Sequence, residues 1–132
     1  MNIKTIINTT IIDFLNENFV EGLEDKWTHN DTTITLRQLL DITKNIPIKN
    51  ISTEILRSKV LDWDGNPEEI KKIEKSDLQY PVLIIVDDNN DIQYILDGNH
   101  RVQKAIMYNL PNVQAKLIKL SELPKEFQYV LG

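Results

Sequence analysis

One stretch of the chain changes abruptly from strand-like to helix-like sequence, and this change constrains the fold more than any other feature. Residues 91–96 are rich in β-branched and aromatic side chains, which is typical of a β-strand. Beyond Gly98, apolar residues recur at helical spacing, namely Val102, Ala105, Ile106 and Leu110. The sequence therefore predicts a strand that turns at Asp97 and Gly98 into a helix over residues 99–109.

The start of this predicted helix combines groups that hold a phosphate or a carboxylate. The first backbone N–H groups of a helix lack intrahelical partners and carry the positive end of the helix dipole. Gly98 allows a ligand to approach the backbone closely, and Arg101 adds a cation with a planar fork of donors. These features favour an anion site. The alternative interpretation is a helix start capped by Asp97 or Asn99, with His100 and Arg101 on the surface.

Turn and capping signals divide the chain after residue 45 into short strands and helices. The predicted strands cover residues 46–51, 81–86, 92–96 and 113–119. The predicted helices cover residues 53–60, 67–75 and 99–109, and residues 125–131 form a short closing helix or two turns. Pro47 suggests that the first strand lies at a sheet edge. The polar residues 87–91 predict a hairpin between the second and third strands.

The N-terminal third of the chain has a different pattern. Apolar residues with a period near 3.6 predict an amphipathic helix over residues 5–25. Residues 27–31 are turn-like, and residues 32–34 can form a short strand. Thr35 is placed to cap a helix over residues 36–43. Such a segment before an α/β core serves for packing or as an interface.

Length and composition limit the classes of function. A chain of 132 residues suits one domain with a proper core. The chain has no cysteine, which excludes disulfides, thiol nucleophiles and cysteine metal sites. The net charge of −5 argues against tight non-specific DNA binding, because such binding depends on Lys and Arg. The longest apolar run is residues 82–86, so we predict no signal peptide, no transmembrane helix and a cytoplasmic location.

Residues 97–101 resemble the signature of the ParB/sulfiredoxin superfamily, whose members carry Gly-x-x-Arg at a strand-to-helix turn. Three further blocks resemble this family in the same order, namely residues 46–51, 77–85 and 113–118. The resemblance covers residues 46–132, about two-thirds of the chain, and leaves residues 1–45 as an N-terminal helical extension. Together with the apolar patterns it predicts a single α/β (α+β) domain over residues 1–132, in which helices flank a small, mixed, curved sheet.

The resemblance implies that the chain binds a nucleotide of the ATP or CTP type, with or without Mg²⁺. The nucleotide-binding residues that it implies are Gly98, Asn99, His100, Arg101, Lys72 and Ser76. Asn99 stands where sulfiredoxin has its catalytic cysteine, and an amide is neither a nucleophile nor a redox group. Sulfinic acid reduction is therefore excluded. Glu69 departs from the family, because an acid repels phosphate unless a metal ion lies between them.

Two classes of function remain open. The first is a nucleotide-dependent kinase, phosphohydrolase or nuclease, in which His100 carries a proton or a phosphoryl group and Arg101 stabilises the transferred charge. Asp97 would orient these side chains or help to hold Mg²⁺. The second is a non-catalytic module that binds a nucleotide or regulates a partner protein, with the N-terminal helix and Trp63 as its contact surface. The lack of a clear general base or pair of metal-binding carboxylates weakens the first class.

Overall fold

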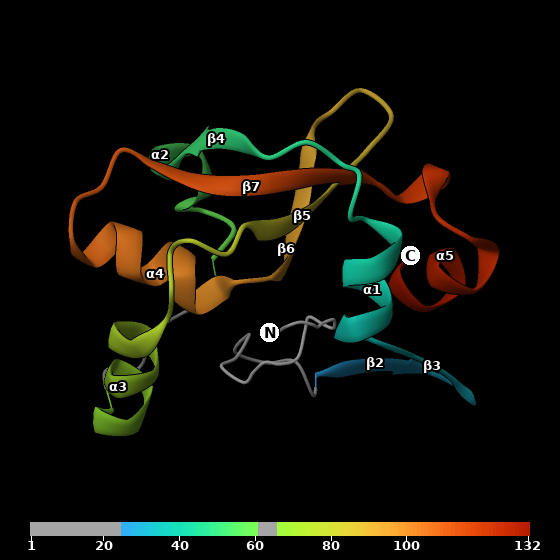
Figure 1. Ribbon diagram of the computed structural model, residues 1–132, viewed down its shortest axis with the longest axis horizontal. Coiled ribbons are helices and arrows are strands. Elements are labelled where there is room, and N and C mark those ends of the chain that lie inside the picture. The colour runs from blue at the N-terminus through green and yellow to red at the C-terminus, as the bar shows by residue number, and fades with distance from the viewer. Residues whose placement is uncertain (1–24, 61–65) are drawn as a thin grey trace, which may run out of the picture.

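A mixed four-stranded sheet organises the protein in a computed structural model that describes residues 25–60 and 66–132 (Figure 1). The strand order is β4-β7-β5-β6, where the strands are β4 (Lys49–Ser52), β5 (Val82–Val86), β6 (Ile92–Asp97) and β7 (Asn112–Lys119). β5 and β7 run parallel, while β4–β7 and β5–β6 are antiparallel. The predicted mixed sheet is therefore confirmed. Its first strand lies at an edge, as expected, but it covers Lys49–Ser52 rather than residues 46–51, so Pro47 precedes the strand.

The hairpin between β5 and β6 follows from its turn residues. Asp87 caps the turn, because its Oδ1 accepts hydrogen bonds from the backbone N–H groups of Asn89 at 2.8 Å and Asp91 at 2.9 Å. Asn90 takes a positive φ of 68°, which Asn tolerates better than most residues. The turn returns the chain antiparallel to the buried strand β5, and β6 then ends at the site described below.

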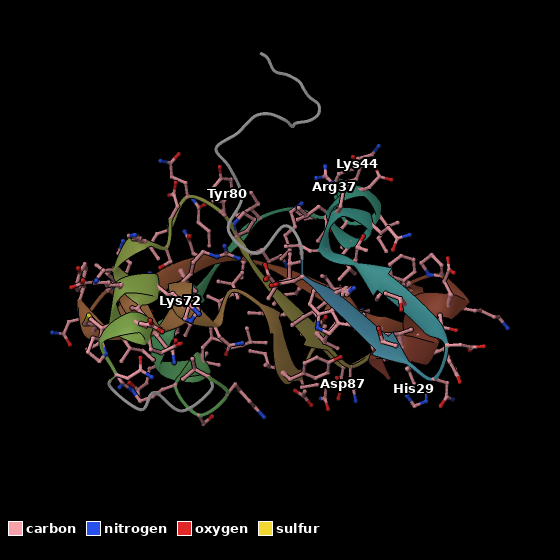
Figure 2. All side chains as sticks on the ribbon, turned by 90° about the horizontal axis from the view of Figure 1, so that it is seen from below. His29, Arg37, Lys44, Lys72, Tyr80 and Asp87 are labelled. Carbon is pink, nitrogen blue, oxygen red and sulfur yellow. The ribbon has the colours of Figure 1, made fainter. Side chains whose placement is uncertain are left out.

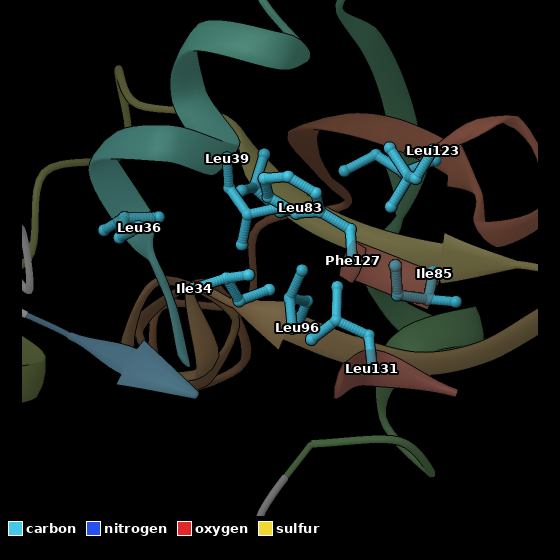
Figure 3. Packing of buried hydrophobic residues seen from close by; sticks show 10 residues of the cluster. Ile34, Leu36, Leu39, Leu83, Ile85, Leu96, Leu123, Phe127 and Leu131 are labelled. Carbon is cyan, nitrogen blue, oxygen red and sulfur yellow. The ribbon is translucent and has the colours of Figure 1, made fainter. Parts of the chain in front are cut away.

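Hydrophobic clusters lie on both faces of the sheet, because successive side chains of β5 point in opposite directions. Leu83 and Ile85 join a cluster with residues of β3, α1 and α5 (Figure 3). Val82, Ile84 and Val86 join a second cluster with residues of α2, α4 and β7. All five side chains of β5 are buried, so this strand forms the centre of the protein.

The described part of the predicted helical extension is a hairpin followed by a helix. β2 (Lys26–His29) pairs antiparallel with β3 (Thr32–Thr35), and α1 (Leu36–Ile42) follows. The prediction that all of residues 27–31 are turn-like was wrong, because Trp27 pairs with Ile34 across the hairpin. The predicted cap is confirmed, since Thr35 and Gln38 form a reciprocal capping box. The other residues of the predicted helix 5–25, and Trp63, lie outside the described residues.

The remaining helices surround the sheet. They are α2 (Thr53–Leu56), α3 (Pro67–Lys75), α4 (Asn99–Met107) and α5 (Lys125–Leu131), with a 3₁₀ turn at Leu120–Glu122. α2 is shorter than the predicted helix 53–60, because the chain continues in turns beyond Leu56. α3 begins as predicted, and Asn66 Oδ1 accepts a hydrogen bond from Glu69 N–H at 2.8 Å. None of the helices within residues 25–60 and 66–132 is long and apolar enough to span a membrane.

Candidate functional site

A pocket of about 490 Å³ lies where α4 begins. Three segments line it: residues 25–27 at the start of β2, Lys72 of α3, and residues 96–101 at the junction of β6 and α4. Figure 1 shows α3 and β2 on opposite sides of the start of α4, and the view from below in Figure 2 agrees. The sequence-predicted turn is therefore one wall of a pocket that two other segments complete.

Gly98 is required at the turn for two reasons. Its φ of +106° lies in the left-handed region that favours glycine. A Cβ atom at this position would lie 2.9 Å from Nη2 of Arg101 and 3.2 Å from the Cα atom of Val82. We predicted that Gly98 leaves room for a ligand, but the group that approaches it most closely is the guanidinium of Arg101.

Arg101 is buried beneath the turn and forms an ion pair with Asp97. Its Nη2 donates to Asp97 Oδ2 at 2.9 Å, and the two side chains are 4% and 12% exposed. A weaker contact of 3.5 Å joins Nη2 to the carbonyl oxygen of Pro81. The Nε of Arg101 has no hydrogen-bond partner within the part of the chain that the structure describes. The alternative interpretation of Arg101 as a surface side chain was therefore wrong, and Asp97 orients it.

The N-terminus of α4 carries no side-chain cap among the described residues. Gly98 occupies the cap position, where the alternative interpretation placed Asp97 or Asn99. A helix end without a capping side chain keeps the partial positive charge of its dipole exposed to whatever lies in front of it. Because residues 97–101 line the pocket, this positive end faces the pocket.

His100 joins α4 to α3 across one side of the pocket. Its Nε2 lies 2.6 Å from Glu69 Oε2, and both side chains are about 30% exposed. The carboxylate of Glu69 is therefore held by the imidazole of His100. A second link comes from Lys104, whose Nζ donates to the carbonyl oxygens of Glu74 and Ser76 at 2.8 Å each. These polar contacts hold the helix that carries Lys72.

Lys72 on α3 and Ser76 just after it were both predicted to bind the nucleotide, but their surroundings differ. Lys72 is exposed and lines the pocket, as Figure 2 indicates by its position beside the α4 start. Ser76 is buried and is not among the pocket residues; its hydroxyl donates to the carbonyl oxygen of Ile73 at 2.6 Å, and a longer contact of 3.4 Å joins it to the carbonyl oxygen of His100. The structure therefore brings Lys72 together with residues 97–101 and does not bring Ser76 to the pocket.

Sequence reasoning missed the third wall of the pocket, which consists of Asp25, Lys26 and Trp27. The available signal was the apolar pair of Trp27 and Ile34 on either side of a short polar turn, which is typical of a hairpin. No group of three or more His, Asp or Glu side chains in residues 25–60 and 66–132 is arranged to hold a metal ion. The pocket residues combine the cations Lys26, Lys72 and Arg101 with the acids Asp25 and Asp97, the start of a helix, one imidazole and one indole.

No family model, curated protein or solved structure matches the chain.

Proposed function

We propose that the protein binds the phosphate groups of a nucleotide at the start of α4, as a ParB/sulfiredoxin-like nucleotide-binding protein. One observation carries the proposal: Lys72 and the N-terminus of α4, where Gly98 occupies the cap position, line the same pocket. Lys26 adds a further cation from the opposite wall. Phosphate oxygens are well suited to this combination, because helix starts and ammonium groups each stabilise negative charge.

Arg101 has a supporting role in this proposal. The positive charge of Arg101 is balanced by Asp97, and burial leaves little of the side chain for a ligand. Its guanidinium instead occupies the space that a Cβ atom on Gly98 would need, and it is bonded to Asp97, the residue just before that glycine. We therefore assign the direct phosphate contacts to Lys72, to His100 and to the backbone of residues 98–100, and we treat Arg101 and Asp97 as positioning residues.

A second candidate function, phosphoryl transfer or nucleotide hydrolysis, is favoured by the pair of Glu69 and His100. A carboxylate 2.6 Å from an imidazole nitrogen holds the ring in one orientation. His100 would then carry the proton in the reaction. Mg²⁺, where it takes part, would enter bound to the nucleotide phosphates, as is usual for this ion.

Calorimetric titration with ATP and CTP, each with and without Mg²⁺, tests the proposal. Lys72→Gln should weaken binding by about 1.5–3 kcal/mol, or roughly 10- to 150-fold, the range for hydrogen bonds to charged groups. Lys71→Gln is the matched control, because Lys71 is an exposed neighbour on α3 that does not line the pocket. Equal effects of the two substitutions, or no heat with either nucleotide, would contradict the proposal.

The His100→Ala variant separates binding from catalysis. If the protein turns a nucleotide over, this substitution should abolish turnover and leave a measurable affinity. If the wild-type protein binds a nucleotide without any release of phosphate, the non-catalytic class is correct and the substitution should lower the affinity alone.

A further inference from the structure

Trp27 is the one tryptophan, tyrosine or phenylalanine side chain among the described residues that line the pocket. It comes from β2, far along the chain from the residues that form the phosphate end. The proposed phosphate site gives this indole no role, since a phosphate group needs cations and N–H donors. The presence of a large aromatic side chain on the wall of a polar pocket therefore needs a separate explanation.

Trp27 is held firmly by its neighbours. Its cross-strand partner is Ile34, which is buried in the cluster beneath the hairpin. Residues opposite each other on paired strands share a face, so Trp27 also points toward this cluster and packs against it. The indole is only partly buried, and it lines the pocket. A ring fixed in this way can contact a ligand at a small cost in side-chain entropy.

The charges around the pocket differ between its two walls. On the β2 wall, the carboxylate of Asp25 and the ammonium group of Lys26 carry opposite charges that balance. On the opposite wall, Asp97 balances Arg101, and the charge of Lys72 adds to the positive end of α4. A ligand with one anionic end and one uncharged end would therefore place its anionic end at α4 and its uncharged end at β2, the arrangement of walls that Figures 1 and 2 show.

We propose that Trp27 is the stacking platform for the base of a nucleoside polyphosphate whose phosphates bind at the start of α4. This inference rests on the proposed function and adds the class of ligand, a nucleotide rather than an inorganic or small organic phosphate. The pocket volume of about 490 Å³ lies within the range of about 300–1,000 Å³ for small-molecule sites, which is far more than a single phosphate group needs. Every base has a π-face, so stacking on Trp27 accounts for nucleotide binding without selecting one base.

Fluorescence can report on Trp27 directly. The chain has two tryptophans, so Trp63→Phe leaves Trp27 as the single tryptophan fluorophore. In this variant, ATP and CTP should quench the emission, whereas inorganic tripolyphosphate should bind and compete with ATP without quenching. Quenching by tripolyphosphate to the same extent as by ATP would overturn the stacking proposal, because the signal would then not depend on a base.

Affinity measurements on two variants complete the test. Trp27→Leu should weaken ATP binding about 5- to 150-fold, the effect expected for loss of one stacked base, and should leave the affinity for tripolyphosphate unchanged. Tyr108→Leu is the matched control, because Tyr108 is an exposed aromatic residue outside the pocket. If Trp27→Leu does not fold, Trp27→Phe replaces it, and it should retain most of the affinity for ATP.

The possible results distinguish this inference from the proposed function. If Trp27→Leu binds ATP as tightly as the wild type while Lys72→Gln binds it weakly, the stacking proposal fails and the phosphate site stands. If the wild-type protein binds neither ATP nor tripolyphosphate, both proposals fail. An equal loss of ATP and tripolyphosphate affinity in Trp27→Leu would show a general distortion of the pocket and would also overturn the stacking role.

Discussion

Replacement of Asp97 by alanine should be strongly destabilising. Arg101 is 4% exposed, and its charge is compensated by a single carboxylate at 2.9 Å among the described residues. After the substitution, the one acceptor within residues 25–60 and 66–132 that still contacts its Nη2 is the carbonyl oxygen of Pro81, at 3.5 Å. A buried cation that loses its partner typically costs about 3–5 kcal/mol. Asp97 itself is partly accessible to water, so we expect a value near the lower end, about 3 kcal/mol.

Thermal unfolding followed by circular dichroism measures this effect. For a chain of 132 residues, an entropy of unfolding of about 2.1 cal/mol/K per residue converts about 3 kcal/mol into a fall in Tm of roughly 11 °C. Asp41→Ala is the matched control, because Asp41 pairs with Lys44 at 3.5 Å in a fully accessible setting where both side chains are at least 67% exposed. An exposed pair contributes at most about 1 kcal/mol, so this control should lose less than about 4 °C.

A double variant adds a second criterion. Asp97→Ala combined with Arg101→Met removes both charges and replaces the guanidinium by an apolar side chain of similar length. Because the unpaired Arg101 cation causes the loss of stability in Asp97→Ala, the double variant should be more stable than Asp97→Ala alone. If Asp97→Ala melts as close to the wild type as Asp41→Ala does, or if the double variant is the least stable of the set, the assignment of Arg101 as a buried, carboxylate-dependent cation is wrong.

Two further predictions concern the turn and the surface charge. Gly98→Ala should lower the free energy of unfolding by at least about 1–2 kcal/mol in a denaturant titration, because the left-handed backbone at this position disfavours a Cβ atom. That Cβ atom would also lie 2.9 Å from Nη2 of Arg101, so unchanged stability would contradict the geometry of the turn. The affinity for random duplex DNA should be weak in a gel-shift assay at physiological salt, as the net charge of −5 predicts, and tight binding with a steep dependence on salt concentration would refute it.

Local signals in the sequence were sufficient for much of the fold. α3 was predicted to begin at Pro67 after the cap Asn66, and it does, because the capping hydrogen bond joins residues three apart and needs no tertiary contact. The hairpin at Asp87 was predictable for the same reason. β2 was not predicted, because its threonine and histidine side chains are polar and are typical of a loop. It forms a strand through its pairing with β3, whose Ile34 belongs to a hydrophobic cluster.

The candidate site was predictable only where it is contiguous in the chain. Residues 97–101 were identified as one unit because a strand-to-helix turn with glycine has a recognisable pattern. The contact of His100 with Glu69 joins residues 31 positions apart, and Trp27 lies still farther along the chain from Gly98. Sequence periodicity carries no information on such contacts, so the burial of Arg101 and the absence of Ser76 from the pocket could be learned only from the fold.

The way in which α3 is attached has a consequence for the local stability of the protein. Among the described residues, neither of the two hydrophobic clusters includes a residue of α3, although Ile73 is buried. The position of α3 beside α4 depends largely on the polar contacts that His100 and Lys104 of α4 make with it. Segments held by few apolar contacts exchange their amide protons through openings that cost less than global unfolding. The amides of α3 should thus exchange faster than those of β5, and a ligand that bridges Lys72 and α4 should slow them selectively.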